Sequence, residues 1–304
     1  MAPPRSDEWI ERLRALGFRG HALAQAPLRD WTTWRIGGPA ELLLTPRDVE
    51  DLERALDWTL ATAIPWRILG NGSNLLVRER GVPGVVLRLR KTLDALRIEG
   101  NGLTAGAGAS FPAVARRAAA AGLGGLEFGA GIPGTIGGAI VMNAGWHEHE
   151  IGATVESVEL LVPGTGRRRL ERDACDFGYR RSAFRGTSAV VLAARLRLAP
   201  GDPAGIAARS ESFVASRKAH QPTELPSCGS VFLKPQGDFA GRLIEAAGLK
   251  GARVGDAQIS PKHANFIVNL GRAASGDVLS LVERAEQAVE REFGVRLERE
   301  FELW

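Results

Sequence analysis

Cysteine is scarce in this chain, which has only Cys175 and Cys228 among its 304 residues. Disulfide frameworks and four-thiolate zinc sites need more cysteines and are excluded, although these two could still pair, and we expect no metal site. No stretch approaches the roughly 20 uninterrupted apolar residues that span a bilayer. Residues 1–16 mix acids with arginines and lack a continuous apolar segment, so we expect no signal or transit peptide and a cytoplasmic protein.

A strong charge of one sign is also missing. The net charge of +4 is spread along the chain and does not by itself indicate nucleic-acid binding. With 44% apolar and 24% charged residues, the composition excludes a disordered or collagenous chain. The length is about twice that of a usual domain of roughly 150 residues, which predicts two domains or one large one.

Helical and strand patterns are mixed along the chain without the regular alternation of a parallel sheet, which predicts the α+β class. In the first half, Thr45 before Pro46 predicts the N-cap of a helix. We expect antiparallel strands at 155–162 and 190–198, with the arginines from Arg167 to Arg169 at a solvated hairpin tip.

Prolines and glycines interrupt both periodicities in the APGDPAG segment at 199–205, which predicts a domain boundary near residue 200. Beyond it, the apolar patterns predict strands at 229–235 and 295–303.

Two glycine-rich segments stand out. The first runs from Gly70 to Asn74 after an expected strand at 66–70, and its glycines permit positive φ while exposing N–H groups that could cradle an anion. An ordinary Asn-Gly turn would explain this segment if it stood alone. The second, GIPGTIGG at 131–138, is another surface of bare backbone. Two such segments about sixty residues apart indicate one long ligand held between them.

The pattern G-x-G-x-x-G occurs at Gly129, Gly131 and Gly134 and would suggest a Rossmann dinucleotide site. That site requires a buried parallel strand before the first glycine, and the preceding Leu-Glu-Phe is too short and too acidic for one. The flanking elements are not βαβ units either, so we assign no Rossmann domain.

Six motifs resemble, in their order, those of the UDP-N-acetylenolpyruvoylglucosamine reductases, the flavoenzyme family that completes UDP-N-acetylmuramate for peptidoglycan. The motifs are TTWRIGGPA (32–40), LGNGSNLLV (69–77), GAGIPGTIGGAIVMNAG (129–145), YRRSAFR (179–185), PSCGSVFLKP (226–235) and LEREF (297–301). The resemblance covers nearly the whole chain. It implies a two-part FAD-binding region of the vanillyl-alcohol-oxidase (PCMH) type over residues 1–200, split near residue 65, and a C-terminal α+β substrate domain over residues 201–304.

The resemblance assigns both glycine segments to FAD and makes NADPH the hydride donor. The residues that would hold FAD are Asn71, Gly72, Ser73, Asn74, Leu75, Ile132, Pro133, Gly134, Thr135, Ile136, Gly137, Gly138, Asn143, Ala144 and Gly145. Some relatives of this fold attach flavin covalently through His or Cys. The loop at 70–74 contains neither, so we expect FAD to be bound non-covalently.

The three catalytic positions of the family correspond to Arg180, Ser230 and Glu300. Arg180 would bind the substrate carboxylate and stabilise the negative charge that hydride addition places on the α-carbon. Ser230 would donate a proton to that carbon. Glu300 would bond to the carboxylate if protonated, or act through water. Spacing does not choose it over Glu298 and Glu302, which share its expected strand face.

Four further residues are candidates for the substrate or nucleotide site: Tyr179, Lys234, Lys262 and His263. His263 also fits a structural histidine. The family divides by whether an inserted loop brings a tyrosine over the uridine. Tyr179 is the single tyrosine and already belongs to the YRRSAFR motif, so the chain resembles the shorter class.

The resemblance therefore implies an NADPH-dependent oxidoreductase that reduces the enolpyruvyl group of UDP-N-acetylglucosamine enolpyruvate to UDP-N-acetylmuramate. We expect a monomer whose partner is this UDP-sugar and not nucleic acid or a membrane. Another FAD-dependent oxidase or dehydrogenase of the same fold is the alternative, and it would consume oxygen without a UDP-sugar. A basic nucleic-acid-binding protein would instead show salt-dependent DNA affinity and no bound chromophore.

Overall fold

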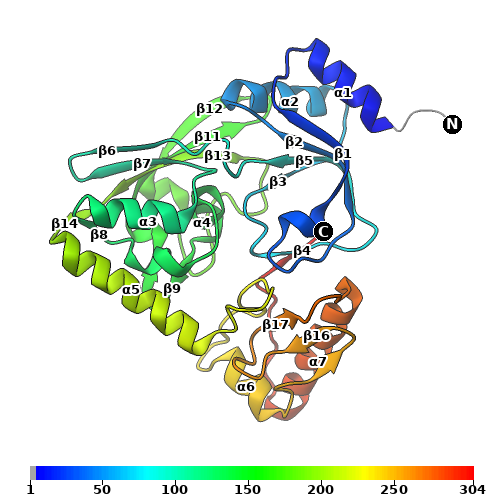
Figure 1. The fold of residues 1–304 in the computed structure, drawn as a ribbon, viewed down its shortest axis with the longest axis vertical. Helices are drawn as coiled ribbons and strands as arrows, with labels where there is room; N and C mark the ends of the chain where they lie inside the picture. The colour runs from blue at the N-terminus through cyan, green and yellow to red at the C-terminus, as the bar shows by residue number, and fades with distance from the viewer. Residues whose placement is uncertain (1–4) are drawn as a thin grey trace. The chain divides into compact units, whose positions relative to one another are not determined.

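The computed structural model describes residues 5–304, which divide into two compact units assembled from alternating chain segments (Figure 1). Unit 1 comprises the described residues up to Gln25, Glu41–Asn71 and Pro83–Ala215, and unit 2 comprises Ala26–Ala40, Gly72–Val82 and Ser216–Trp304. Helices and strands are mixed in both, which confirms the α+β class.

The units do not follow the expected division at residue 200. Helix α5 (Pro203–His220) begins inside the expected linker, because a proline is tolerated in the first turn of a helix, where its missing N–H would have no partner. Two segments from the first half of the chain belong to unit 2. The assignment of FAD binding to residues 1–200 and of substrate binding to residues 201–304 stays a prediction.

The first sheet of unit 1 has the strand order β1-β2-β5-β3. Its strands are β1 (His21–Pro27), β2 (Pro39–Thr45), β5 (Val82–Arg88) and β3 (Trp66–Leu69). Strands β3 and β5 are parallel, and helices α1 (Arg5–Ala15) and α2 (Val49–Ala61) complete this part. Its core contains fully buried leucines, among them Leu42, Leu44 and Leu52.

Helix α2 begins later than expected, and its N-cap is Asp48 and not Thr45. Strand β2 continues through Thr45, so this residue is committed to the sheet. The Asp48 carboxylate accepts a hydrogen bond of 2.9 Å from the backbone N–H of Asp51. That bond, together with nearby Arg19, lowers the pKa of Asp48.

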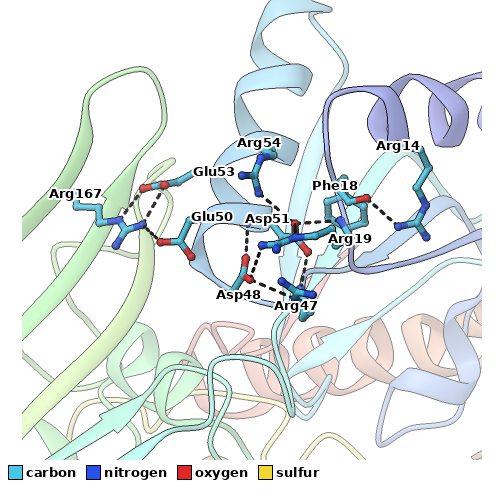
Figure 2. A network of polar contacts seen from close by, with 10 residues as sticks. All are labelled: Arg14, Phe18, Arg19, Arg47, Asp48, Glu50, Asp51, Glu53, Arg54 and Arg167. Carbon is cyan, nitrogen blue, oxygen red and sulfur yellow. Dashed lines mark hydrogen bonds and ion pairs between the residues drawn. The ribbon is translucent and has the colours of Figure 1, made fainter.

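Asp51, one turn further on, is fully buried and anchors a polar network (Figure 2). Its carboxylate accepts bonds of 3.1 Å from the backbone N–H groups of Arg19 and Arg47. It also pairs with the Arg54 guanidinium at 3.4 Å. One side chain thus fastens the start of α2 to the loop before β1 and to the loop after β2.

The arginines at 167–169 do not form a hairpin tip, because they lie inside strand β12 (Gly166–Glu171). Arg167 donates to Glu53 at 2.7 Å and to Glu50 at 2.9 Å, both on α2. The pair with Arg167 lowers the pKa of Glu50. The sequence pattern missed this pairing because the glutamates lie more than 110 positions earlier in the chain.

The second sheet of unit 1 has the order β12-β11-β13-β7-β6. Its other strands are β11 (Val155–Val162), β13 (Val190–Arg197), β7 (Gly102–Gly106) and β6 (Leu96–Glu99). The antiparallel pair expected at 155–162 and 190–198 is confirmed. Helices α3 (Phe111–Ala120) and α4 (Ile136–Met142) lie over this sheet and share its core (Figure 1).

Short elements complete unit 1. They are β8 (Leu123–Gly124), β9 (Gly145–Trp146), β10 (His149–Glu150), β14 (Ala199–Pro200) and the 3-10 helices η2 (Glu127–Gly131), η3 (Ile151–Ala153) and η4 (Arg172–Cys175). The residues before the G-x-G-x-x-G pattern are therefore a 3-10 turn and not a strand, as the rejection of a Rossmann site requires.

Unit 2 is built around helix α7 (Ser275–Phe293), whose apolar face packs into its core. The other elements are η1 (Leu28–Trp31), β4 (Leu75–Leu76), α6 (Ala240–Ala246), β15 (Arg253–Val254), β16 (Ala257–Ile259), β17 (Ile267–Asn269) and β18 (Glu302–Leu303). Strands β15, β16 and β17 form an antiparallel sheet.

The long strands expected at 229–235 and 295–303 are wrong. The two segments meet only in an isolated bridge between Phe232 and Arg299, and β18 is the sole strand within the second. The physical reason lies on the other edge of the segment at 229–235. There the backbone of Phe232 is hydrogen-bonded to the side chain of Asn265 and not to a neighbouring strand.

Candidate functional site

The two glycine segments approach each other at Gly70 and Thr135 in unit 1. A Cβ atom at Gly70 would lie 2.7 Å from the Thr135 hydroxyl, so only glycine allows this approach. The same hydroxyl caps α4 by accepting a 3.3 Å bond from the N–H of Gly138. The two glycine segments therefore lie in contact at these residues, and the long ligand expected between them stays a prediction.

Not every amide of the second segment is available to a ligand. The N–H of Ile136 donates to Ala109 O at 2.9 Å, and that of Gly137 donates to Ala107 O at 2.8 Å. These two amides hold the start of α4 against the residues that follow β7. These two N–H groups are therefore committed within the fold, and the assignment of residues 132–138 to FAD stays a prediction.

From Gly72 onward, the first glycine segment lies in unit 2. Gly72 has φ +62°, and a Cβ there would lie 2.3 Å from Trp31 O, so the position requires glycine. The side-chain amide of Asn74 donates to Glu300 O at 3.1 Å, and the Asn74 carbonyl accepts from Glu302 N at 3.0 Å. Parallel pairing of β4 with β18 continues this contact. The end of the glycine loop thus holds the C-terminal segment in place.

Asn143 is 1% exposed and makes three side-chain hydrogen bonds. Its amide nitrogen donates to Glu150 Oε2 at 2.8 Å and to Gly178 O at 2.9 Å, and its oxygen accepts from Gly152 N at 2.9 Å. It also ends α4 in the left-handed conformation, which asparagine tolerates well. Its side chain therefore ties together three stretches of chain, a role that the sequence did not predict.

One of these stretches leads into the turn that carries Arg180. Gly178 and Arg181 exchange two backbone hydrogen bonds of 3.0 and 2.9 Å across the turn. Arg180 lies between them with φ +52°, a conformation that costs a non-glycine residue about 1–2 kcal/mol. Its guanidinium donates to Gly145 O at 3.1 Å and lies over the Tyr179 ring, 5.3 Å from its centroid. Backbone strain of this kind is concentrated at functional sites.

Ser230 and Glu300 are brought together in unit 2. Ser230 is half-buried in the loop before Val231, and the N–H of Glu300 donates to Val231 O at 2.8 Å. Glu298 and Glu302 are exposed, whereas Glu300 is half-buried. The structure thus distinguishes three glutamates that the sequence spacing left equivalent.

Both cysteines are free thiols. Burial, and then the negative charge of Glu300, raises the pKa of Cys228. Burial, and then the charge of Glu171, raises the pKa of Cys175 to about 11. Neither is therefore a thiolate at neutral pH.

The four candidate substrate residues have different surroundings. Tyr179 is 53% exposed beside Arg180, whereas the Lys234 ammonium lies 4.5 Å from the centroid of the Phe239 ring. Lys262 donates to Lys218 O at 2.6 Å. The Nδ1 atom of His263 accepts from the N–H of Asn265 at 3.2 Å, which fits the structural interpretation of this histidine.

The described residues contain neither a metal-binding cluster nor a membrane-spanning helix. Across residues 5–304, no cluster of three or more His, Cys, Asp and Glu side chains is arranged to hold a metal ion. In the same range, no helix has the length and apolarity required to cross a bilayer.

Comparison with known proteins identifies relatives of the whole chain. A model of an FAD binding domain matches residues 40–169, and a model of the C-terminal domain of UDP-N-acetylenolpyruvoylglucosamine reductase matches residues 221–304. The chain is 46% identical to UDP-N-acetylenolpyruvoylglucosamine reductase 2 of Symbiobacterium thermophilum, over 97% of this chain and 96% of that one. It is 45% identical to the reductase of Moorella thermoacetica, over 95% of each chain. The crystal structure of the reductase from Thermus caldophilus superposes with a TM-score of 0.81 at 41% identity, covering 94% of this chain and 99% of that one.

Proposed function

This chain belongs to the UDP-N-acetylenolpyruvoylglucosamine reductase family, and we propose on that basis that Arg180, Ser230 and Glu300 perform its reaction. The protein is an FAD-dependent oxidoreductase that reduces the enolpyruvyl group of UDP-N-acetylglucosamine enolpyruvate to UDP-N-acetylmuramate, with NADPH as the reductant. Its FAD-binding region is of the vanillyl-alcohol-oxidase type. The observation that carries this conclusion is an identity of 46% over nearly the whole length of both chains.

The residues at the two glycine segments fit a bound FAD. Gly70 and Gly72 both hold backbone where a Cβ would collide with neighbouring atoms, which keeps these surfaces bare. Residues 71–75, 132–138 and 143–145 would hold FAD non-covalently. These residues would thereby place a group that supplies hydride transfer between NADPH and the terminal carbon of the enolpyruvyl group.

Arg180 would hold the substrate carboxylate. A planar guanidinium binds a carboxylate through two parallel hydrogen bonds and remains charged at any working pH. Its backbone at φ +52° and its bond to Gly145 O restrict the side chain before substrate arrives. Preorganised positive charge lowers the barrier for a step that builds negative charge on the neighbouring carbon.

Ser230 would complete the reduction by donating its hydroxyl proton to the α-carbon. A hydroxyl is a weak acid in water, but a carbanion-like carbon is a strong base, so placement matters more than pKa; general acid catalysis of this kind contributes about 10²–10⁴-fold. The half-buried Glu300 would bond to the carboxylate or to a water beside it. Tyr179, Lys234, Lys262 and His263 are proposed to contact the substrate.

The test separates the two halves of the reaction. Purified protein is expected to be yellow, and anaerobic NADPH titration should bleach the flavin absorbance. Ser230→Ala should leave this bleaching intact and nearly abolish re-oxidation by the enolpyruvyl substrate. Ser227→Ala, in the same loop, is the matched control and should behave like the wild type. Unchanged turnover of Ser230→Ala would remove Ser230 from its role.

The alternative, an oxidase or dehydrogenase of the same flavin fold, is not favoured by the relatives. An oxygen electrode tests it directly, because rapid oxygen consumption without the UDP-sugar would support it. We also propose a monomer acting in the cytoplasm, where NADPH and nucleotide sugars are available. Light scattering after gel filtration tests the first of these.

A further inference from the structure

Asn265 forms an unusual set of hydrogen bonds with the residues that directly follow Ser230. It is 8% exposed and lies in the turn between β16 and β17. Its side-chain oxygen accepts from Phe232 N at 2.9 Å, while its side-chain nitrogen donates to Phe232 O at 2.9 Å. Its own carbonyl accepts from Val231 N at 2.8 Å. One residue therefore provides three hydrogen bonds that a neighbouring strand would otherwise supply.

The opposite edge of the same segment is bonded to the C-terminal residues. Val231 O accepts from Glu300 N, and Leu233 N donates to Glu298 O, both at 2.8 Å. Residues 231–233 are thus held from both sides, by Asn265 and by the segment that carries Glu300. Because Ser230 directly precedes the held segment, its backbone is fixed relative to that of Glu300.

Asn265 is itself held in place. The N–H of Asn265 donates to His263 Nδ1 at 3.2 Å, and Phe266 N donates to His263 O at 3.0 Å. The turn is closed further where Ser260 N donates to Phe266 O at 2.8 Å. The amide of Asn265 therefore has little freedom to follow a displaced Phe232.

We propose that Asn265 is a positioning residue that fixes the Ser230 hydroxyl and the Glu300 carboxylate for protonation of the substrate. The inference rests on the proposed roles of Ser230 and Glu300. Loss of the Asn265 amide leaves the N–H and C=O of Phe232 without partners in a buried place, and the segment must shift to satisfy them. A displacement of about 1 Å at a reacting group costs on the order of 10²-fold in rate.

The experiment measures the two half-reactions of the FAD-loaded enzyme separately by anaerobic rapid mixing. In Asn265→Ala, flavin reduction by NADPH should stay within about twofold of the wild type, because it does not use Ser230. Re-oxidation by the enolpyruvyl substrate should slow by about 10–100-fold. Asn265→Asp keeps an acceptor for Phe232 N–H but turns a carboxylate oxygen toward Phe232 O, so it should slow the same step at least as much. If the alanine variant does not fold, the re-oxidation rate of Asn265→Asp is compared with that of the wild type instead.

Asn269→Ala is the matched control. Asn269 is 2% exposed and also makes three side-chain hydrogen bonds, to Trp34 O, Gly271 N and Ala273 N, none of them to residues 230–233. The proposal is overturned if the Asn265 variants re-oxidise at the wild-type rate, or if Asn269→Ala slows re-oxidation as much as they do. Ser230→Ala is measured in parallel. Normal re-oxidation in that variant would reject the role of Ser230 itself, a result distinct from failure of the Asn265 inference alone.

Discussion

Removal of the buried Asp51 carboxylate should destabilise unit 1 more than any surface change on helix α2. Asp51 is fully buried, and its two oxygens accept from the backbone N–H groups of Arg19 and Arg47 (Figure 2). Both hydrogen bonds lie in a partly buried place, so water can replace the carboxylate only in part. Asp51→Ala therefore breaks the link between three chain segments at once.

The size of the effect follows from these contacts. Each N–H left unsatisfied costs about 1–3 kcal/mol. The ion pairs with Arg19 and Arg54 add little, because those side chains are 49% and 39% exposed and exposed pairs contribute about 0–1 kcal/mol. Together they predict a loss of about 3–5 kcal/mol, the usual cost of removing one member of a buried charged network. Asp51→Asn keeps one acceptor and turns a donor toward the second N–H, so about half of this loss is expected.

Thermal unfolding followed by circular dichroism measures the effect. At about 2–4 °C per kcal/mol, Asp51→Ala should lower the transition that reports unit 1 by about 6–20 °C, with Asp51→Asn between it and the wild type. Asp57→Ala is the control, because Asp57 is exposed on the same helix and should change stability by less than about 0.5 kcal/mol. If Asp51→Ala melted like Asp57→Ala, the reasoning from the buried network would be refuted.

Three further predictions follow from the site. Gly72→Ala should weaken FAD binding and lower the melting temperature, because its Cβ would collide with Trp31 O; an FAD titration that matches the wild type would contradict this. Asn143→Ala should lower kcat/KM by about 10–100-fold through the Arg180 turn while the FAD spectrum persists, and steady-state kinetics of the holoenzyme will show whether it does. Burial, and then the positive charge of Lys250, holds the pKa of His263 below its usual value. The unfolded chain therefore binds a proton at His263 more readily than the folded protein does. Folding stability is lost as the pH falls below about 6.5, where the unfolded chain takes up that proton. Melting curves between pH 8 and 5 should fall more steeply for the wild type than for His263→Gln, and parallel curves would exclude the linkage.

Local patterns in the sequence predicted several strands, the glycine loops and the family of this protein. The segments at 155–162 and 190–198 are largely apolar and long enough to be read as strands, and they do form an antiparallel pair. Motif order identified the reductase family, and the relatives bear this out. The glycines at 70 and 72 were recognised as special because only a residue without Cβ permits such backbone.

Other features depended on partners distant in the chain. Thr45 has the side chain of a helix cap, but it pairs in strand β2, and the cap of α2 is Asp48. Glu300 could not be told from its neighbours, because its partial burial results from packing in unit 2 and not from period-two spacing. The segment at 229–235 read as a strand, yet its second edge is paired by the Asn265 side chain.

The amino-acid sequence by itself determined the α+β class, the glycine loops and the family with its reaction, because these depend on residue type and local order. The tertiary structure alone decided that Asn143 and Asn265 are buried hydrogen-bonding centres. An asparagine in a sequence gives no sign of which backbone groups it will satisfy. Those groups, at Gly178 and Phe232, lie more than 30 residues away and come within reach only after the chain has folded.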